Sequence, residues 1–132
     1  MTVRLSLDVA DVRAVDVEPF FEGWATRPSP DRILAALRGA DEVALAWDGD
    51  RLVGFATMLT DDALFAYLPL VEVVTDHRGE GIGSRLVNDL VERCAERYGV
   101  DLCCDDDVVA FYERLGFARV NGMVRRRPEA LP

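Results

Sequence analysis

The chain has 132 residues, 50% of them hydrophobic, which is enough to bury roughly two-thirds of the unfolded surface without disulfide or metal staples. Its 15 basic and 24 acidic residues leave a net charge of −9, which disfavours nucleic-acid binding because phosphate backbones are also negative. No stretch approaches the roughly 20 apolar residues of a membrane span, and the first residues lack the apolar core of a signal peptide, so we expect a cytoplasmic protein with no membrane partner.

The N-terminal part of the sequence predicts a strand and two helices. Apolar and polar residues alternate over 3–9, which is the pattern of a half-buried strand. Apolar residues between Val17 and Trp24 recur at helical spacing, which predicts a helix with its aromatic side chains in the core. Ser29 and Pro30 then predict the N-cap and first turn of a second helix, which ends near Gly39.

The middle of the sequence predicts three strands. Two β-rich runs, 43–47 and 52–59, flank a glycine-containing turn at 48–50, which is typical of a hairpin. The next apolar stretch contains Pro69, and a proline favours an edge strand, an end of a strand or a bulge. We therefore expect the strand proper to cover 70–75, with a distortion at the proline.

The C-terminal part predicts two helices and three further strands. Apolar residues at helical spacing predict helices over 81–98 and 108–115, with a short strand at 100–104 between them. The Asn121-Gly122 dipeptide within 117–127 predicts a final hairpin. No repeat or long linker interrupts the pattern, so we expect one mixed α/β domain over residues 1–132.

A glycine-rich loop follows the strand that contains Val71 and opens the helix that begins near Gly81. Glycines let backbone amides converge on an anion, and the positive end of the helix dipole adds to the attraction, which favours a diphosphate. A dinucleotide fingerprint starting at Gly79 would need glycine where Ser84 stands, and the sequence contains no G-K-[ST] of a P-loop. The alternative is a turn softened by glycine that binds nothing.

Two motifs carry a resemblance to a known family. Arg78-Gly79-Glu80-Gly81-Ile82-Gly83 resembles the Q/R-x-x-G-x-G/A loop of the GNAT N-acetyltransferase superfamily, and residues 110–117 (AFYERLGF) resemble its F-Y-x-x-x-G-F signature. The resemblance implies a mostly antiparallel sheet of about six to seven strands flanked by about four helices. It also implies acetyl-CoA as co-substrate and direct acetyl transfer to a primary amine in a ternary complex.

The resemblance further implies where acetyl-CoA binds. The pyrophosphate would contact the loop amides, and the pantetheine would run along the strand as an extra strand, satisfying backbone groups that a fold must otherwise pair. The expected cofactor-binding residues are Val71, Val73, Arg78, Gly79, Glu80, Gly81, Ile82, Gly83, Ser84 and Asp105. Glu80 and Asp105 depart from the family, which often has a basic residue and an asparagine there, so we expect weaker and more salt-sensitive cofactor binding.

Acetyl transfer needs a neutral amine, a donor for the oxyanion and a proton for the leaving thiolate. Tyr112 occupies the general-acid position that the resemblance implies; the alternative is a tyrosine that only packs on a helix face. Glu72 lies in an apolar strand, where an unpaired charge is unfavourable, and is the candidate base. Its alternative is a salt bridge to an arginine on a covering helix. The oxyanion donor would be the N–H of Val71 or a neighbour.

The remaining reactive side chains suggest no further site. Three cysteines without C-x-x-C spacing and one histidine offer no metal-ligand set, so we expect no metal, and the odd cysteine count fits a reducing compartment. We interpret His77 as a residue on the loop surface. Cys103 and Cys104 occupy adjacent positions of a predicted strand, so one should face the core and the other the cleft.

The acceptor and the assembly are less defined. Acidic residues near the expected cleft weakly favour a cationic amine, either a small molecule or an amine of a peptide. Members of the resembling family often dimerise, which leaves a homodimer open. A different class of function also fits these residues, namely a non-catalytic acyl-CoA-binding regulatory module with the same fold.

Overall fold

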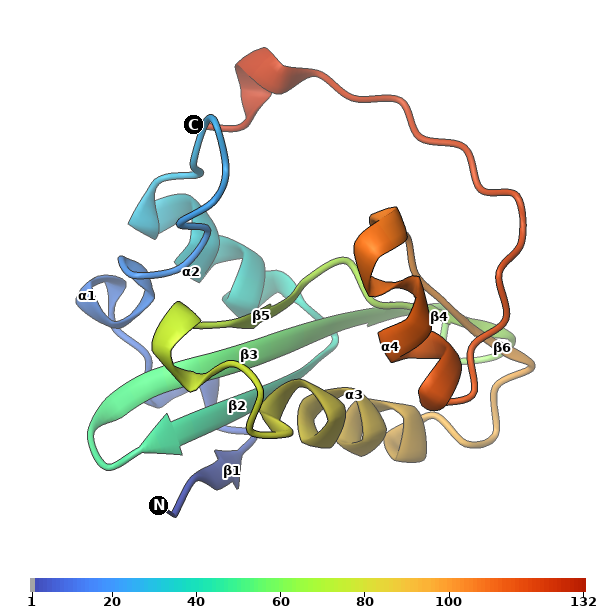
Figure 1. The fold of residues 1–132 in the computed structure, drawn as a ribbon, viewed down its shortest axis with the longest axis horizontal. Coiled ribbons are helices and arrows are strands. Elements are labelled where there is room, and N and C mark those ends of the chain that lie inside the picture. Colours follow the sequence, from blue (N-terminus) through green and yellow to red (C-terminus); the bar gives the residue numbers. More distant parts are fainter. Residues whose placement is uncertain (1) are drawn as a thin grey trace.

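A computed structural model describes residues 2–132, in which six strands form one mostly antiparallel sheet flanked by four helices (Figure 1). The strands are β1 (Arg4–Ser6), β2 (Glu42–Asp48), β3 (Arg51–Thr60), β4 (Phe65–Tyr67), β5 (Val71–Val73) and β6 (Gly99–Asp101). The helices are α1 (Ala14–Val17), α2 (Pro30–Gly39), α3 (Ile82–Arg93) and α4 (Val109–Arg114). Over the described residues, no helix is both long and apolar enough to cross a membrane. The six-stranded sheet and its four helices confirm the predicted mixed α/β class.

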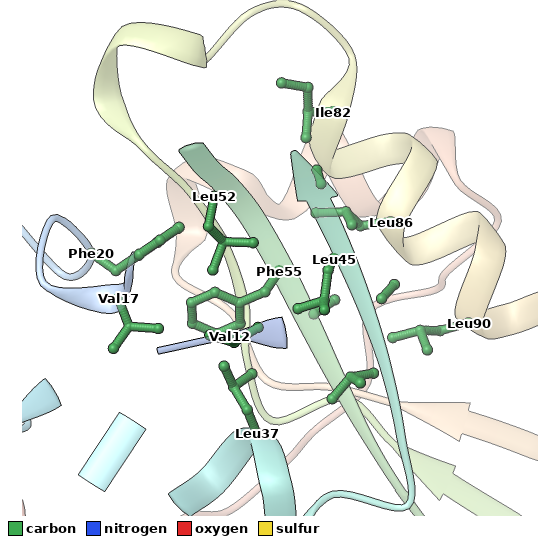
Figure 2. Packing of buried hydrophobic residues seen from close by; sticks show 14 of the residues in the cluster. Val12, Val17, Phe20, Leu37, Leu45, Leu52, Phe55, Ile82, Leu86 and Leu90 are labelled. Atoms are coloured by element: carbon green, nitrogen blue, oxygen red, sulfur yellow. The ribbon is translucent and has the colours of Figure 1, made fainter. Parts of the chain in front are cut away.

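The β2–β3 hairpin forms the centre of the sheet, as the sequence predicts, and turns at Gly49 with a φ of 61°. Helix α3 covers one face, while α1 and α2 lie on the other (Figure 1). Gly54 of β3 allows α3 to lie close, because a Cβ there would be 3.1 Å from both Ile82 and Leu86. On the opposite face, the rings of Phe20 and Phe55 are 4.8 Å apart (Figure 2). The hairpin is therefore buried from both sides.

The sheet forks at Pro69. Before the proline, β4 runs parallel to β6, and Leu68 N donates to Asp101 O at 3.0 Å. Pro69 has no N–H to continue this ladder. Both β4 and β5 pair with β3, but only β4 also pairs with β6, so the sheet separates between β5 and the chain that follows β6. The distortion expected at Pro69 is thus confirmed.

Several predicted elements differ from the structure near the N-terminus. Strand β1 covers only three residues. Helix α1 ends at Val17, so the predicted helix over 17–24 is wrong, because Pro19 lacks the N–H that would continue the ladder. Phe20 and Phe21 are nevertheless buried in the core, whereas Trp24 is 45% exposed.

Two predictions are also wrong around β6. Helix α3 ends at Arg93, five residues before the predicted end at Tyr98, and the Tyr98 side chain is 84% exposed rather than on the apolar face. Strand β6 ends at Asp101, so Cys103 and Cys104 lie beyond it and both are exposed. The prediction that one faces the core and the other the cleft is wrong because the strand stops too early.

The predicted C-terminal hairpin over 117–127 is absent, and this stretch runs without strand or helix from α4 toward α2 (Figure 1). Its far end is fixed where Arg32 Nη2 donates to the Ala130 carbonyl at 2.8 Å. Two strands alone are at best marginally stable in water, and here Val120 and Met123 are 81% and 98% exposed. The strands predicted on either side of the Asn121-Gly122 turn therefore have no apolar surface of their own chain to pack against.

Candidate functional site

Strand β5 has a free edge on the side of the fork. Leu70 O and Val74 N form backbone hydrogen bonds with β3 at 3.0 and 2.9 Å, and Glu72 lies in register between them. Antiparallel pairing alternates along a strand, so the backbone groups of Val71 and Val73 point the other way, toward the gap. The two strand residues predicted to bind pantetheine are thus those with outward-facing backbone groups.

The loop after β5 presents backbone amides at the start of α3. Gly79 and Gly81 have φ angles of 81° and 80°, the left-handed region that glycine tolerates, and Gly81 is the N-cap of the helix. A Cβ at either glycine would meet no atom within 4 Å among the described residues, so the space above the loop is open. The first N–H groups of α3 lack intrahelical partners and suit an anion.

The exposed side chain of Arg78 folds back from this loop onto β5. Its Nε donates to the Val73 carbonyl at 3.1 Å, on the free edge. The half-buried carboxyl of Glu72 has its pKa raised to about 7 by burial, with Arg78 opposing the shift. The charge that acts on Glu72 therefore comes from the loop, not from an arginine of a covering helix. Glu72 lies opposite Phe55, on the sheet face that carries the Phe20 ring.

His77 is buried, at 7% exposure, and not on the loop surface as predicted. Its Nε2 lies 2.9 Å from Asp48 and its Nδ1 lies 3.2 Å from Asp76, so it joins the β2–β3 turn to the start of the loop. Arg51 pairs with Asp76 at 2.8 Å. The bonds to Asp48 and Asp76 raise the pKa of His77, while Arg51 and then His77 lower the pKa of Asp76 to about 2. Sequence spacing gives no signal for this network.

Tyr112 lies on α4, where its ring packs against Phe111 and Phe117 at 4.9 and 5.8 Å. Burial first, and then the nearby Cys104 and Glu72, raise the pKa of its hydroxyl to about 12. Among residues 2–132 this hydroxyl has no protein hydrogen-bond partner. The ring therefore packs as the alternative interpretation required, while the hydroxyl stays available for chemistry.

Glycine 83 connects the loop to α4. A Cβ there would lie 3.3 Å from Cζ of Phe111, the residue before Tyr112. Ile82 is buried in the core, and Ser84 is partly buried in the first turn of α3. The free edge, the amide loop and the helix of the tyrosine thus form one contiguous region.

Glu80 and Asp105, the two acidic residues that depart from the family pattern, are both exposed. Glu80 lies between the two left-handed glycines at the tip of the loop. Asp105 precedes the 3-10 turn Asp106–Val108, and its side chain makes no hydrogen bond within the described chain. Cys104 is a neighbour of the tyrosine that the sequence did not suggest, because its own strand ends earlier than predicted.

Comparison with known proteins agrees with this geometry. The profile of the acetyltransferase (GNAT) family matches residues 9–117. An uncharacterized N-acetyltransferase, ycf52, of Porphyra purpurea is 31% identical over 102 residues, covering 74% of this chain and 59% of that protein. The histone acetyltransferase TAP1 of Glycine max is 30% identical over 122 residues, covering 81% of this chain and 52% of that protein. The chain thus spans only between half and three-fifths of the length of these two relatives.

Solved structures give the same result. A putative acetyltransferase from Deinococcus radiodurans R1 superposes with a TM-score of 0.90 at 39% identity, covering 95% of this chain and 88% of that one. Glucosamine-6-phosphate N-acetyltransferase from Arabidopsis thaliana superposes with a TM-score of 0.79 at 18% identity over 97% of this chain and 99% of that one, and shows the fold alone. The chain belongs to the GNAT acetyltransferase family.

Proposed function

We propose that the protein transfers an acetyl group from acetyl-CoA to a primary amine. The observation that carries the proposal is the free edge of β5, which leads directly into the amide-rich loop at the start of α3. An extended chain ending in a diphosphate matches this arrangement, because the edge offers backbone donors and acceptors and the loop offers amides for an anion. Acetyl-CoA has such a shape, and it would supply the acetyl thioester.

The residues of the β5 edge and of the loop would bind different parts of acetyl-CoA. The Val71 carbonyl and the backbone groups of Val73 would hydrogen-bond the pantetheine arm, which leaves the Val71 N–H for the acetyl group. Arg78 now donates to the Val73 carbonyl along the free edge, so we expect its side chain to move aside when an extended ligand pairs with that edge. The exposed guanidinium is then free to turn to the phosphates, next to the amides of residues 79–84.

Glu72 is suited to be the base. A primary amine with a pKa near that of lysine, about 10.4, arrives as an ammonium and must lose a proton before it can attack. The Glu72 pKa of about 7 makes this carboxyl a better proton acceptor at neutral pH than an ordinary glutamate. Its negative form would also attract a cationic amine, which is the acceptor class that we propose.

Val71 would stabilise the oxyanion, and Tyr112 would protonate the leaving sulfur. The amine nitrogen forms a bond to the acetyl carbon, and the Val71 N–H would stabilise the resulting oxyanion. The carbon–sulfur bond then breaks as the Tyr112 hydroxyl donates to the leaving sulfur. Since a hydroxyl with a pKa of about 12 is a weaker acid than a thiol at about 8.5, complete transfer is uphill, and it requires the second amine proton to replace the one that Tyr112 gives.

The test is release of free CoA thiol from acetyl-CoA with a panel of primary amines, beside a calorimetric titration with acetyl-CoA alone. Binding together with amine-dependent thiol release is the expected result. Binding without turnover for any amine would support a non-catalytic acyl-CoA-binding module instead. Absence of binding would overturn the assignment of the β5 edge and loop as well.

A further inference from the structure

His77 is a buried titratable residue that the proposed mechanism does not use. It is the single histidine of the chain, and it ends the 3-10 turn Thr75–His77, which leads from β5 into the amide loop. Its side chain is only 9% exposed. Burying a polar side chain is unfavourable unless its polar atoms are paired, so the partners of His77 indicate its role.

Both ring nitrogens of His77 face carboxylate oxygens. Nε2 lies 2.9 Å from Oδ2 of Asp48, at the end of β2, and Nδ1 lies 3.2 Å from Oδ1 of Asp76, in the same turn as the histidine. A neutral imidazole has one N–H, so it can donate to only one of the two carboxylates and presents a lone pair to the other. The observed arrangement therefore fits the imidazolium, which donates from both nitrogens.

The surrounding charges favour the same form. The hydrogen bonds to Asp48 and Asp76 raise the pKa of His77 above its ordinary value of 6.5, and burial opposes the shift. The negative charge of Glu80, in the loop, raises the pKa further. The cation of Arg51, on β3, pairs with Asp76 at 2.8 and 3.0 Å and not with the ring.

These contacts connect the start of the loop to the central hairpin. Asp48 and Arg51 are opposite each other in the β2–β3 ladder, next to the hairpin turn, whereas Asp76 and His77 come directly before the loop. Residues 78–81 are all exposed, so the body of the protein offers their side chains little support. The conformation of the loop therefore depends on its two ends, which are α3 on one side and His77 on the other.

We propose that His77 is a positioning residue for the amide loop: as an imidazolium it ties the loop to Asp48 and Asp76, and loss of its proton breaks one tie, loosens the loop and weakens acetyl-CoA binding. The inference rests on the proposed function, because it takes acetyl-CoA as the ligand of the loop. A diphosphate needs several amides in one arrangement, and a loop that adopts this arrangement only part of the time binds more weakly in proportion.

The direction of the pH dependence follows from the raised pKa of His77. The folded state holds the proton more tightly than the unfolded chain, so the ties are complete below pH 6.5 and one is lost as the pH rises through the raised pKa. Acetyl-CoA should therefore bind more weakly toward alkaline pH. Glu72 responds in the opposite sense as a base, because its ionised form increases as the pH rises through about 7.

The first measurement follows the ring by ¹⁵N nuclear magnetic resonance, in which the imidazole signals of a single histidine are unambiguous. We expect both nitrogens to be protonated at neutral pH, with a titration midpoint above 6.5. Asp48→Asn keeps an oxygen acceptor and removes the charge, so it should lower the midpoint. Asp50→Asn is the matched control, because it makes the same change at an exposed residue of the same turn.

The second measurement is calorimetric titration with acetyl-CoA on either side of that midpoint. The affinity of the unaltered protein and of Asp50→Asn should fall by about fivefold across it, less than a full charge-assisted hydrogen bond because Asp48 is partly exposed. His77→Gln should bind weakly at both pH values, and Asp48→Asn should lose affinity at its own lower midpoint. Any effect of Glu72 on binding remains in all the variants. Without ligand, ¹⁵N order parameters of residues 79–84 should fall together with the affinity.

Two results would overturn the inference and leave the proposed function intact: a ring with one protonated nitrogen at neutral pH, or equal acetyl-CoA affinity in His77→Gln and the unaltered protein on both sides of the midpoint. If His77→Gln does not fold, Asp48→Asn decides, and a midpoint and affinity equal to those of Asp50→Asn would overturn the inference. An unaltered protein that binds no acetyl-CoA at either pH would overturn the proposed function as well, and it is recognised by absent binding, not by equal binding.

Discussion

Strands β5 and β6 each present an edge without a neighbouring strand, and their surroundings differ. The β5 edge leads into a loop of backbone amides, and a carboxyl with a raised pKa lies on the strand itself. The β6 edge borders a cavity between acidic residues and an arginine-rich stretch. The two edges thus offer the same unpaired peptide groups in different electrostatic surroundings, and we expect only the β5 edge, with its loop of amides, to suit an anionic ligand.

Gly81→Asp should affect the first step, binding of the cofactor, because it acts at the loop and leaves the β6 edge unchanged. The new side chain adds a negative charge and fills the open space above the amides. We expect acetyl-CoA affinity to fall by more than about 100-fold, equivalent to losing one or two charge-assisted hydrogen bonds. Calorimetric titration measures this.

The control for this change is Gly49→Asp, which places the same residue at another glycine of positive φ, in the β2–β3 turn. It should share the backbone strain and keep the affinity. Unchanged affinity in a folded Gly81→Asp protein would remove the loop from cofactor binding.

Tyr112→Phe should lower kcat by about 10² to 10⁴, the usual effect of one acid–base group. The ring remains, so its contacts with Phe111 and Phe117 and the affinity for acetyl-CoA should barely change. Steady-state kinetics beside a binding titration measures this, with the exposed Tyr98→Phe as control. A kcat near that of the unaltered protein would leave Tyr112 as a packing residue only.

Glu72→Gln should lower kcat/KM by about 10² or more and remove its pH dependence. In the unaltered protein kcat/KM should rise with pH and level off above about 7, because only the ionised carboxyl accepts a proton. The exposed Glu92→Gln on α3 serves as control. An unchanged pH profile in the variant would exclude Glu72 as the base.

The same substitution predicts a change in stability. The pKa of Glu72 is raised on folding, so between about 4.5 and 7 the folded state binds more protons, and its stability falls as pH rises through this window. Above it the buried charge remains unfavourable, and Glu72→Gln should raise the free energy of unfolding by roughly 1–3 kcal/mol. Denaturant unfolding at pH 5 and pH 8 measures this, with little difference expected at the lower pH.

Glu80→Lys should have the smallest effect and the opposite sign. Replacing the exposed carboxylate at the loop tip with a cation should tighten acetyl-CoA binding by about fivefold at low salt, and less as salt screens the charges. Titrations at two ionic strengths measure this. Glu96→Lys, an equal change of charge on an exposed residue near the far end of α3, should have less effect. Equal affinities for both variants would mean that Glu80 points away from the phosphates.

The sequence predicts some elements well because local and tertiary preferences agree there. The β2–β3 hairpin has a glycine turn, and helices cover both faces of the sheet there. The Asn121-Gly122 turn is the stronger local signal, yet its flanks carry arginines and no part of the same chain covers them. A turn motif says how a hairpin can close, whereas burial decides whether it does.

The limits of prediction at the candidate site have the same origin. The strand, the glycine loop and α4 follow from spacing, and so does the break at Pro69. The helix predicted after Val17 does not form, although its apolar spacing is helical, because Pro19 has no N–H to continue the hydrogen-bond ladder. The burial of His77 depends on Asp48, 29 residues earlier, and no local pattern reports such a contact.

Gly83 has a consequence for the distance between the loop amides and the Tyr112 hydroxyl. The absent side chain leaves room for the ring of Phe111 beside the first turn of α3, since a Cβ at 83 would lie 3.3 Å from Cζ, and this contact contributes to the separation between the helix of Tyr112 and the loop amides. A carrier arm has a fixed length, and its sulfur meets the hydroxyl only if that separation matches. If the loop and Tyr112 act as proposed, the residue at 83 therefore affects the distance between the amides that would bind the diphosphate and the hydroxyl that would protonate the sulfur, and a bulkier side chain would change that distance.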